Sequence, residues 1–264
     1  MSASIKNIAS SKGFPGNPVL VAGPSSGAPT VYLHGLLGQD WDGLLDTLSQ
    51  KRRVYSPAHP GSDQPDELKD IDDIHDLVLY YDELFDKLEL DQVDLVGHSL
   101  GGMLAAEIAA CYPKRVRKLV LIDPLGLWMD ETPVQDFLLV NPNRLAELML
   151  GDPHSEAVKS KLAMPEDPAA KVTEILRRFT TMASVAHFLW PIPERGLKKR
   201  LHRITADTLI IWGEQDKFVP RAYAEQFSSQ IRGARVEVIA GAGHTPQFSH
   251  GADVAAKIES FLGR

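Results

Sequence analysis

Short apolar segments alternate with longer amphipathic segments along most of this chain. The apolar segments are rich in Val, Ile and Leu and are bounded by Gly, Pro and Asp; they read PTVYLHG, RRVYSPAHPG, QVDLVGH, RKLVLIDP, DTLIIWGE and ARVEVIAGAGH. Such runs are typical of strands that are buried on both faces, as in a parallel sheet. We therefore expect these segments to form a mostly parallel sheet.

The segment 70–88 shows the amphipathic pattern most clearly. Its apolar residues recur at helical spacing and are Ile74, Leu77, Val78, Tyr81, Leu84, Phe85 and Leu88. Most of the acidic residues lie off that face, which predicts a helix with one buried and one solvated side. Strands that alternate with such helices imply an α/β fold, a doubly wound sheet with helices on both faces. The first 30 residues suggest a short hairpin that would add antiparallel edge strands.

The alternation stops between residues 125 and 200. This segment shows no strand pattern and suggests several short helices separated by Pro and Gly, and it is too long for a loop. We therefore divide the chain into a core, 1–124 and 201–264, and an all-helical cap, 125–200. The cap leaves the sheet after KLVLID and returns before DTLIIWG. Ligands bind outside the carboxyl ends of strands in such sheets, so the cap should roof the site.

Composition narrows the classes of function. The 264 residues carry a net charge of -7, which argues against a nucleic-acid surface. The single cysteine, Cys111, forms no internal disulfide and is expected in the core, so a reducing compartment and a cytoplasmic location are expected. We find no signal-peptide pattern at the start and no apolar run of the ~20 residues that a membrane span needs.

The turn around Ser99 carries the strongest chemical signal. It reads GHSLGG, a Gly-x-Ser-x-Gly pattern with a predicted strand before it and a predicted helix after it. Glycines on both sides of the serine permit a sharp, strained turn that exposes the hydroxyl. The start of the helix also directs free backbone N–H groups toward the turn. This context predicts a nucleophilic serine.

Two further residues complete a candidate triad. Asp216 lies in WGEQDKFVP, just past a predicted strand, and His244 lies in GAGH, after the last one. Asp123 in LIDPLG is a rival for the acid, since it ends the strand after the nucleophile helix. We favour Asp216 and expect Asp123 to cap or order the entry to the insertion. The order Ser, Asp, His is that of the α/β-hydrolase triad.

The chain resembles the α/β-hydrolase fold superfamily over nearly its whole length, through VYLHGLLG, GHSLGG, WGEQDKFVP and GAGH. The resemblance implies that Ser99 attacks an acyl carbon, that His244 transfers its proton, and that Asp216 orients the imidazole. The backbone N–H groups of Leu36 and Leu100 would form the oxyanion hole. No metal or dinucleotide motif is present, so we expect neither a metal nor a cofactor.

Other histidines border this site. We expect His34 and His98 to shape it by hydrogen bonding. His59 in SPAHPGSDQP ends another strand, where related sequences usually have a longer Gly-x-Gly-x-Ser loop. The shortened loop either opens the pocket or has no effect.

The leading hypothesis is a serine hydrolase of uncharged carboxylic esters with small to medium acyl groups. Apolar residues of the insertion should cover the pocket, namely Leu127, Trp128, Met129, Phe137, Met182, Phe188 and Trp190. Dense charges in 125–170 argue against the exposed apolar patch of an interfacial lipase. A small-molecule substrate is the only expected partner, with no nucleic acid and no membrane.

Three alternatives stay open. One is hydrolysis of carbon–carbon bonds in ring-fission products; relatives with that activity usually have HGGGPG where this chain has HGLLG, and they use a cap arginine for a substrate carboxylate. Arg144, Arg177 and Arg178 are available for that role. The others are a cofactor-free haloperoxidase or perhydrolase activity, and a small-molecule receptor on the same fold.

Overall fold

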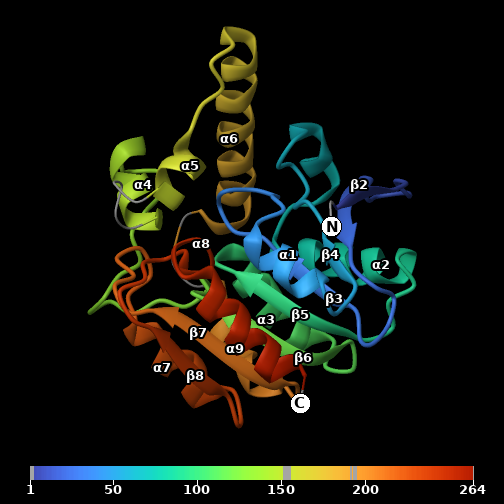
Figure 1. Ribbon diagram of the computed structural model, residues 1–264. Helices are drawn as coiled ribbons and strands as arrows, with labels where there is room; N and C mark the ends of the chain where they lie inside the picture. Colours follow the sequence, from blue (N-terminus) through green and yellow to red (C-terminus); the bar gives the residue numbers. More distant parts are fainter. Residues whose placement is uncertain (1–2, 151–155, 191, 193–194, 264) are drawn as a thin grey trace.

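The computed structural model describes residues 3–150, 156–190, 192 and 195–263, and eight strands form one sheet across it (Figure 1). The strands are β1 (Ser4–Ile8), β2 (Asn17–Ala22), β3 (Thr30–Leu33), β4 (Val54–Ser56), β5 (Val93–His98), β6 (Val116–Ile122), β7 (Asp207–Gly213) and β8 (Arg235–Ile239). Their order in the sheet is β1-β2-β4-β3-β5-β6-β7-β8. Strand β2 is antiparallel to β1 and β4, and the other neighbours are parallel. The mostly parallel sheet and its antiparallel edge are therefore as predicted.

Helices cover both faces of the sheet, as expected for a doubly wound fold. The helices outside the insertion are α1 (Gly43–Ser49), α2 (Ile74–Lys87), α3 (Leu100–Cys111), α7 (Ala222–Gln230), α8 (Pro246–Ser249) and α9 (Gly251–Leu262). Short 3-10 turns lie at Pro65–Asp70, Leu197–Lys199 and Leu201–Arg203. Alternate strand residues point to opposite faces, so Leu121 packs with α2 and α3, whereas Ile122 packs with α1 and α9.

Helix α2 follows the predicted pattern. All seven apolar residues of the predicted stripe are buried. The side chain of Asp73 caps the helix by accepting the N–H groups of His75 and Asp76. The cap and the apolar stripe together explain why the helix begins where it does and which side it presents to the sheet.

The chain between β6 and β7 contains no strand among its described residues, as predicted for the insertion. Its helices are α4 (Pro142–Leu150), α5 (Glu156–Leu162) and α6 (Pro168–Leu189). The C-terminal half of α6 lies over a core loop, because Thr181 Oγ1 donates to the carbonyl of Ser62 and Ser184 Oγ donates to that of Pro60. The exact division into core and cap domains stays a prediction.

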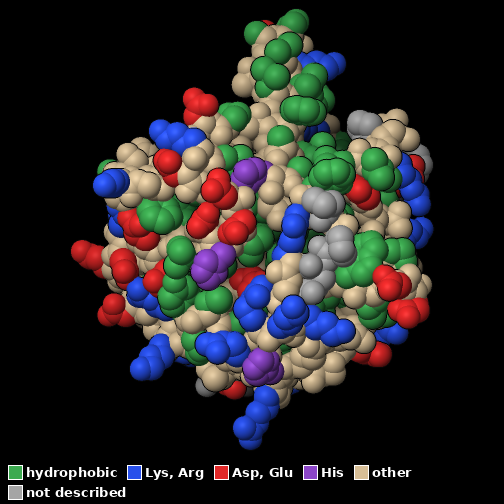
Figure 2. All heavy atoms as spheres, turned by 180° about the vertical axis from the view of Figure 1, so that it is seen from behind, with side chains coloured by type: hydrophobic (Ala, Val, Ile, Leu, Met, Phe, Trp, Pro, Cys, Tyr) green, Lys and Arg blue, Asp and Glu red, His purple; other side chains and the backbone are tan. Residues whose placement is uncertain are grey.

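The N-terminal half of α6 projects from the body of the molecule (Figure 1). Its outer face carries Val172, Ile175, Leu176 and Phe179, which are 56, 50, 60 and 68% exposed. Figure 2 shows hydrophobic side chains over this projection, whereas acidic and basic side chains are interspersed over the body. These apolar residues of α6 lie just beyond the charged segment 125–170, so the argument from charge does not extend to them. The argument against an interfacial lipase stays a prediction. No helix in the described part of the chain is long and apolar enough to cross a membrane.

Candidate active site

Ser99 occupies a strained turn between β5 and α3. Its backbone has φ 56° and ψ -117°, a conformation that is costly for a residue other than glycine. The flanking glycines are required by space: a Cβ on Gly97 would lie 2.2 Å from the carbonyl oxygen of Gly101, and one on Gly101 would lie 2.0 Å from that of Leu33. The strand, turn and helix therefore pack too closely for side chains at these two positions.

The structure brings the three predicted triad residues together. His244 Nε2 lies 2.9 Å from Ser99 Oγ, and His244 Nδ1 lies 2.8 Å from Asp216 Oδ2. The backbone N–H groups of Phe218 and Val219 donate to Asp216 Oδ1 at 2.8 and 2.9 Å. An ionised Asp216 accepts the proton on Nδ1, which leaves the lone pair of Nε2 facing the serine hydroxyl. The side chains are arranged for proton transfer from Ser99 to His244.

Asp123 lies beside this arrangement and does not cap the insertion, so that part of our expectation was wrong. It follows β6 directly with φ 42°, and its Oδ1 accepts the N–H of Gly213 at 2.9 Å. Asp216, rather than Asp123, bonds to His244. Burial, followed by the charge of Asp216, raises the pKa of Asp123 well above its ordinary value.

The loop after β3 lies against the nucleophile. A Cβ on Gly35 would lie 2.8 Å from Ser99 Cβ, so the backbone of this loop passes directly beside the serine. Leu36 and Leu100 are both buried. Among the described residues, neither of their backbone N–H groups donates to a protein acceptor. Buried N–H groups without an acceptor are rare, and these two flank Ser99 in sequence or in space.

The alpha/beta hydrolase fold family model matches residues 29–251, which is most of the chain and includes all three residues of the predicted triad. The chain belongs to the alpha/beta hydrolase fold family. A curated relative within it, 2-hydroxymuconate semialdehyde hydrolase of Pseudomonas sp. (strain CF600), is 27% identical over 251 residues. The match covers 90% of this chain and 87% of that protein.

Solved structures of hydrolases from this family share the fold. A meta-cleavage product hydrolase from Pseudomonas fluorescens IP01 aligns with a TM-score of 0.74 at 21% identity, over 98% of this chain and 97% of its own. A carboxylesterase from Bacillus subtilis aligns with a TM-score of 0.74 at 20% identity, over 99% of this chain and 92% of its own. The alpha/beta hydrolase fold is thus shared with proteins named for carbon–carbon bond cleavage and for ester cleavage.

A buried histidine network supports the loop after β3, and sequence reasoning missed half of it. His59 Nε2 donates to the carbonyl of His34 at 2.7 Å, and the backbone N–H of His59 donates to His34 Nε2 at 3.0 Å. His34 Nδ1 then donates to the carbonyl of Gly35. Since His59 Nε2 is the donor, Nδ1 accepts the hydroxyl of Tyr81 at 2.5 Å. Neutral histidines satisfy every one of these bonds.

The expected hydrogen-bonding roles of His34 and His98 are therefore observed. His98 Nε2 donates to the carbonyl of His244 at 2.8 Å, and this bond connects the loop that carries His244 to the end of β5. His59 is buried and bonded on both ring nitrogens, and whether the shortened loop that carries it opens the pocket stays a prediction. The hydrogen bond between His59 and Tyr81 could not be predicted from the sequence, because the two residues are 22 positions apart and no motif connects them.

Burial of His59 should make the protein less stable in acid. Desolvation lowers the pKa of His59 from 6.5 to about 4, so the unfolded chain binds a proton between these values and the folded chain does not. The free energy of unfolding therefore has its full value above pH 6.5, the pKa of an ordinary histidine, and it falls as the pH drops toward about 4, the pKa of the buried His59. Between pH 6.5 and about pH 5 the loss should be about 2 kcal/mol.

Urea unfolding of wild type and His59→Gln across this pH range measures that loss. Glutamine retains an N–H donor but does not titrate, so the pH dependence of the variant should be shallower by about 2 kcal/mol. The exposed residue His202 supplies the matched control, His202→Gln. Equal pH dependence in wild type and His59→Gln would contradict a buried neutral His59.

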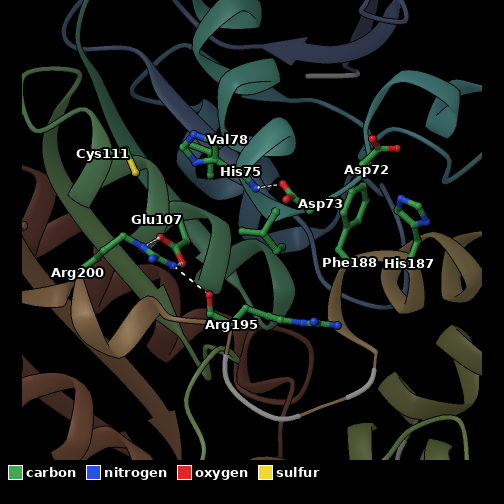
Figure 3. A pocket seen from close by; sticks show the side chains of 11 residues that line it. Asp72, Asp73, His75, Val78, Glu107, Cys111, His187, Phe188, Arg195 and Arg200 are labelled. Carbon is green, nitrogen blue, oxygen red and sulfur yellow. Dashed lines mark hydrogen bonds and ion pairs between the residues drawn. The ribbon is translucent and has the colours of Figure 1, made fainter.

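Two cavities lie near the insertion. One of about 20 Å³ is mostly apolar, and its lining includes Met103, Leu125 and Leu127. The other, of about 490 Å³, is lined by residues of α2, α3, α6 and 195–200, including the half-buried Cys111, which we expected in the core (Figure 3). No triad residue lines the larger cavity, and Arg200 in its wall is paired with Glu107. Size alone therefore does not identify the reactive site.

A metal ion would need at least three His, Cys, Asp or Glu side chains whose ligand atoms lie close together. Among the described residues one such group has its ligand atoms within 4.8 Å of one another. It consists of Asp123, Asp216 and His244. Two of these atoms, on Asp216 and His244, bond to each other, and the other oxygen of Asp216 accepts two backbone N–H groups. The donor set is therefore engaged as a hydrogen-bonded acid–histidine pair, an arrangement that suits proton transfer rather than metal coordination.

Proposed function

We propose that this chain is a serine hydrolase in which Ser99 attacks the carbonyl carbon of an ester. The observation that carries the proposal is the continuous hydrogen-bonded arrangement of Ser99, His244 and Asp216. His244 accepts the hydroxyl proton as the Ser99 oxygen bonds to the carbon, and Asp216 stabilises the imidazolium that forms. His244 then donates that proton to the oxygen of the alcohol leaving group as the ester bond breaks. In the second half of the reaction His244 takes a proton from water as the water oxygen bonds to the acyl carbon, and it returns that proton to Ser99 Oγ as the bond between the acyl group and the serine breaks.

The two unpartnered N–H groups support this chemistry. In the proposed mechanism the N–H groups of Leu36 and Leu100 donate to the oxyanion that develops on the carbonyl oxygen. Donors that are already oriented stabilise the transition state without reorganisation, and removing one such donor typically costs about 10²- to 10³-fold in turnover. The hydrogen bonds through His34 and His59 hold the loop that carries Leu36.

The pocket environment favours uncharged substrates with small to medium acyl groups. Leu127, Phe137 and Phe188 of the insertion are buried in the same hydrophobic cluster as Leu36 and Leu100. A neutral ester enters such surroundings at little cost, whereas a charged group needs a buried partner. The exposed apolar stripe on α6 consists of Val172, Ile175, Leu176 and Phe179. Because of this stripe, the charges in 125–170 are no longer sufficient to argue against lipid substrates.

Ser99 and His244 are fully buried, so substrate reaches them only if the surrounding segments move. Helix α4 is one of the elements concerned, because the carbonyl of Met149 accepts the hydroxyl of Thr245, the residue after His244. The C-terminal half of α6 is another, through its bonds to the loop at 60–62. In the proposed function these contacts separate when substrate enters.

Carbon–carbon bond hydrolysis is the second candidate, and the position of Arg177 favours it. Arg177 Nη1 lies 3.0 Å from where a Cβ on Gly38 would be, so the guanidinium reaches the loop beside Ser99. Its Nε and Nη2 bind Glu174, which leaves Nη1 directed at this loop. Arg178 instead binds Glu174 and the 161–163 backbone, and Arg144 is exposed and pairs with Glu147. Of the three arginines, Arg177 is placed to bind a substrate carboxylate.

A substrate panel separates the two candidates. We expect kcat/KM for p-nitrophenyl esters to peak at short or medium acyl chains in a series from acetate to palmitate, and a ring-fission dienoate to be cleaved poorly. A maximum at the long-chain end would contradict the pocket argument. A preference for the dienoate that Arg177→Gln removes and Arg144→Gln retains would establish carbon–carbon hydrolysis instead.

A further inference from the structure

Asp123 presents a buried carboxyl group that the proposed mechanism does not use. The side chain is fully buried, and its backbone lies in the left-handed region at φ 42°, where a residue other than glycine is uncommon. Its Oδ1 accepts one N–H, from Gly213, and its Oδ2 has no hydrogen-bond partner among the described residues. A buried carboxylate oxygen without a donor is unfavourable and calls for an explanation.

The neighbouring carboxyl group supplies that explanation. Ligand atoms of Asp123, Asp216 and His244 all lie within 4.8 Å of one another. Two carboxylates that are buried this close together repel each other, and this repulsion favours a proton on one of them. Asp216 accepts three hydrogen bonds, from His244 Nδ1 and from the N–H groups of Phe218 and Val219, and these stabilise its charge. Asp123 accepts only one, so the proton belongs on Asp123.

We propose that Asp123 is a neutral carboxylic acid whose Oδ2–H donates a hydrogen bond to Asp216, and that it is a positioning residue for the acid of the triad. The orphaned Oδ2 then has a partner, and the pair carries a single negative charge on the side that faces His244. The proposal rests on the proposed function, because it assigns a role relative to the triad. It also accounts for the strained backbone at Asp123, which turns the carboxyl group inward at the end of β6.

The charged and titratable surroundings agree with a neutral Asp123. The titratable groups that lie close to it are Asp216 from the loop after β7 and His244 from the loop after β8. The next ring outward is that of His98, which lies 5.1 Å from that of His244. Burial lowers the pKa of His98 to about 3, so that ring is neutral near pH 7. No described Lys or Arg forms an ion pair with Asp123 or Asp216 that would stabilise a second negative charge.

Two variants test the role through the pH profile of kcat/KM. Asp123→Gly relieves the backbone strain but removes the donor, and we expect a loss of about tenfold or more in kcat. Asp123→Asn tolerates the left-handed backbone and restores an N–H donor to Asp216, so it should recover most of that loss. Because Asn and a protonated Asp are both neutral, the acid limb of the profile, where His244 takes up a proton, should stay in place.

An ionised Asp123 makes a different prediction for the same variant. Asp123 and His244 have ligand atoms within 4.8 Å of each other, so removing a negative charge from Asp123 would move the acid limb of Asp123→Asn downward by about one to two pH units. Such a shift would overturn the proposal. So would equal activity of Asp123→Gly and Asp123→Asn, since no donor would then be needed.

Infrared spectroscopy tests the protonation state without any substrate. The difference spectrum between wild type and Asp123→Asn at pH 7 should contain the carbonyl stretch of a protonated carboxylic acid, and the band should shift in deuterium oxide. Asp253→Asn, which removes an exposed carboxylate on α9, is the matched control and should lack this band. Absence of the band for Asp123 would overturn the proposal even if the chain had no esterase activity, and its presence would support it in that case.

Discussion

Ser99→Ala should lower ester turnover by about 10⁴-fold or more and leave the fold intact. In the proposed mechanism the hydroxyl of Ser99 bonds to the substrate carbon, because its oxygen lies 2.9 Å from the candidate base, His244 Nε2. Binding and the oxyanion donors would supply the residual activity. Alanine should tolerate the turn poorly at φ 56°, but serine at this position bears the same strain. Steady-state kinetics on p-nitrophenyl esters measure the effect.

The control for this variant is Ser160→Ala, which removes a hydroxyl from an exposed position on α5. It should retain the activity of wild type. The circular dichroism spectrum of Ser99→Ala should match that of wild type, and its thermal midpoint should fall by only a few degrees, because the serine hydroxyl contributes one hydrogen bond to the folded state. Retention of most of the activity in a folded Ser99→Ala protein would exclude Ser99 as the nucleophile.

The second large effect is expected for Asp216→Asn, with a loss of up to about 10⁴-fold in turnover. The substitution keeps the volume of the side chain but removes its charge. It also allows the amide to donate to His244 Nδ1, which places the imidazole proton on Nε2, where it can no longer accept from Ser99. Asp123→Asn should cost far less, because Asp123 makes no bond to His244.

The comparison of these two variants decides which acid belongs to the triad. Both replace a buried Asp by Asn of nearly the same volume, and they differ in that only Asp216 is bonded to His244. The far-downfield proton resonance of His244 Nδ1–H should disappear in Asp216→Asn and persist in Asp123→Asn. A larger loss of turnover in Asp123→Asn would instead assign the triad acid to Asp123.

The sequence predicted the fold well because its signals are local. The strand before Ser99, the glycines around it and the helix after it occur within 20 residues, and the same holds for the loops that carry Asp216 and His244. Parallel strands share one carboxyl edge, so residues at the ends of β5, β7 and β8 converge without any knowledge of side-chain packing. The buried face of α2 could likewise be read from its spacing.

Contacts between distant segments could not be predicted in this way. The bond of His59 to Tyr81 depends on how α2 settles against the loop after β4, and the inward turn of Asp123 depends on its unusual backbone. The stripe on α6 illustrates a different limit. Its spacing predicts an amphipathic helix, but a pattern does not say whether its apolar side meets the core or the solvent, and Phe179 meets solvent.

Labelling with a fluorophosphonate probe tests the central claim most directly, because the probe reacts only with a serine that a neighbouring base has activated. Mass spectrometry of the digested protein should find one adduct, on the peptide that contains Ser99. The adduct should be lost in Ser99→Ala and strongly slowed in Asp216→Asn. A folded wild-type protein that stays unlabelled, or that carries its adduct on another residue, would contradict the account.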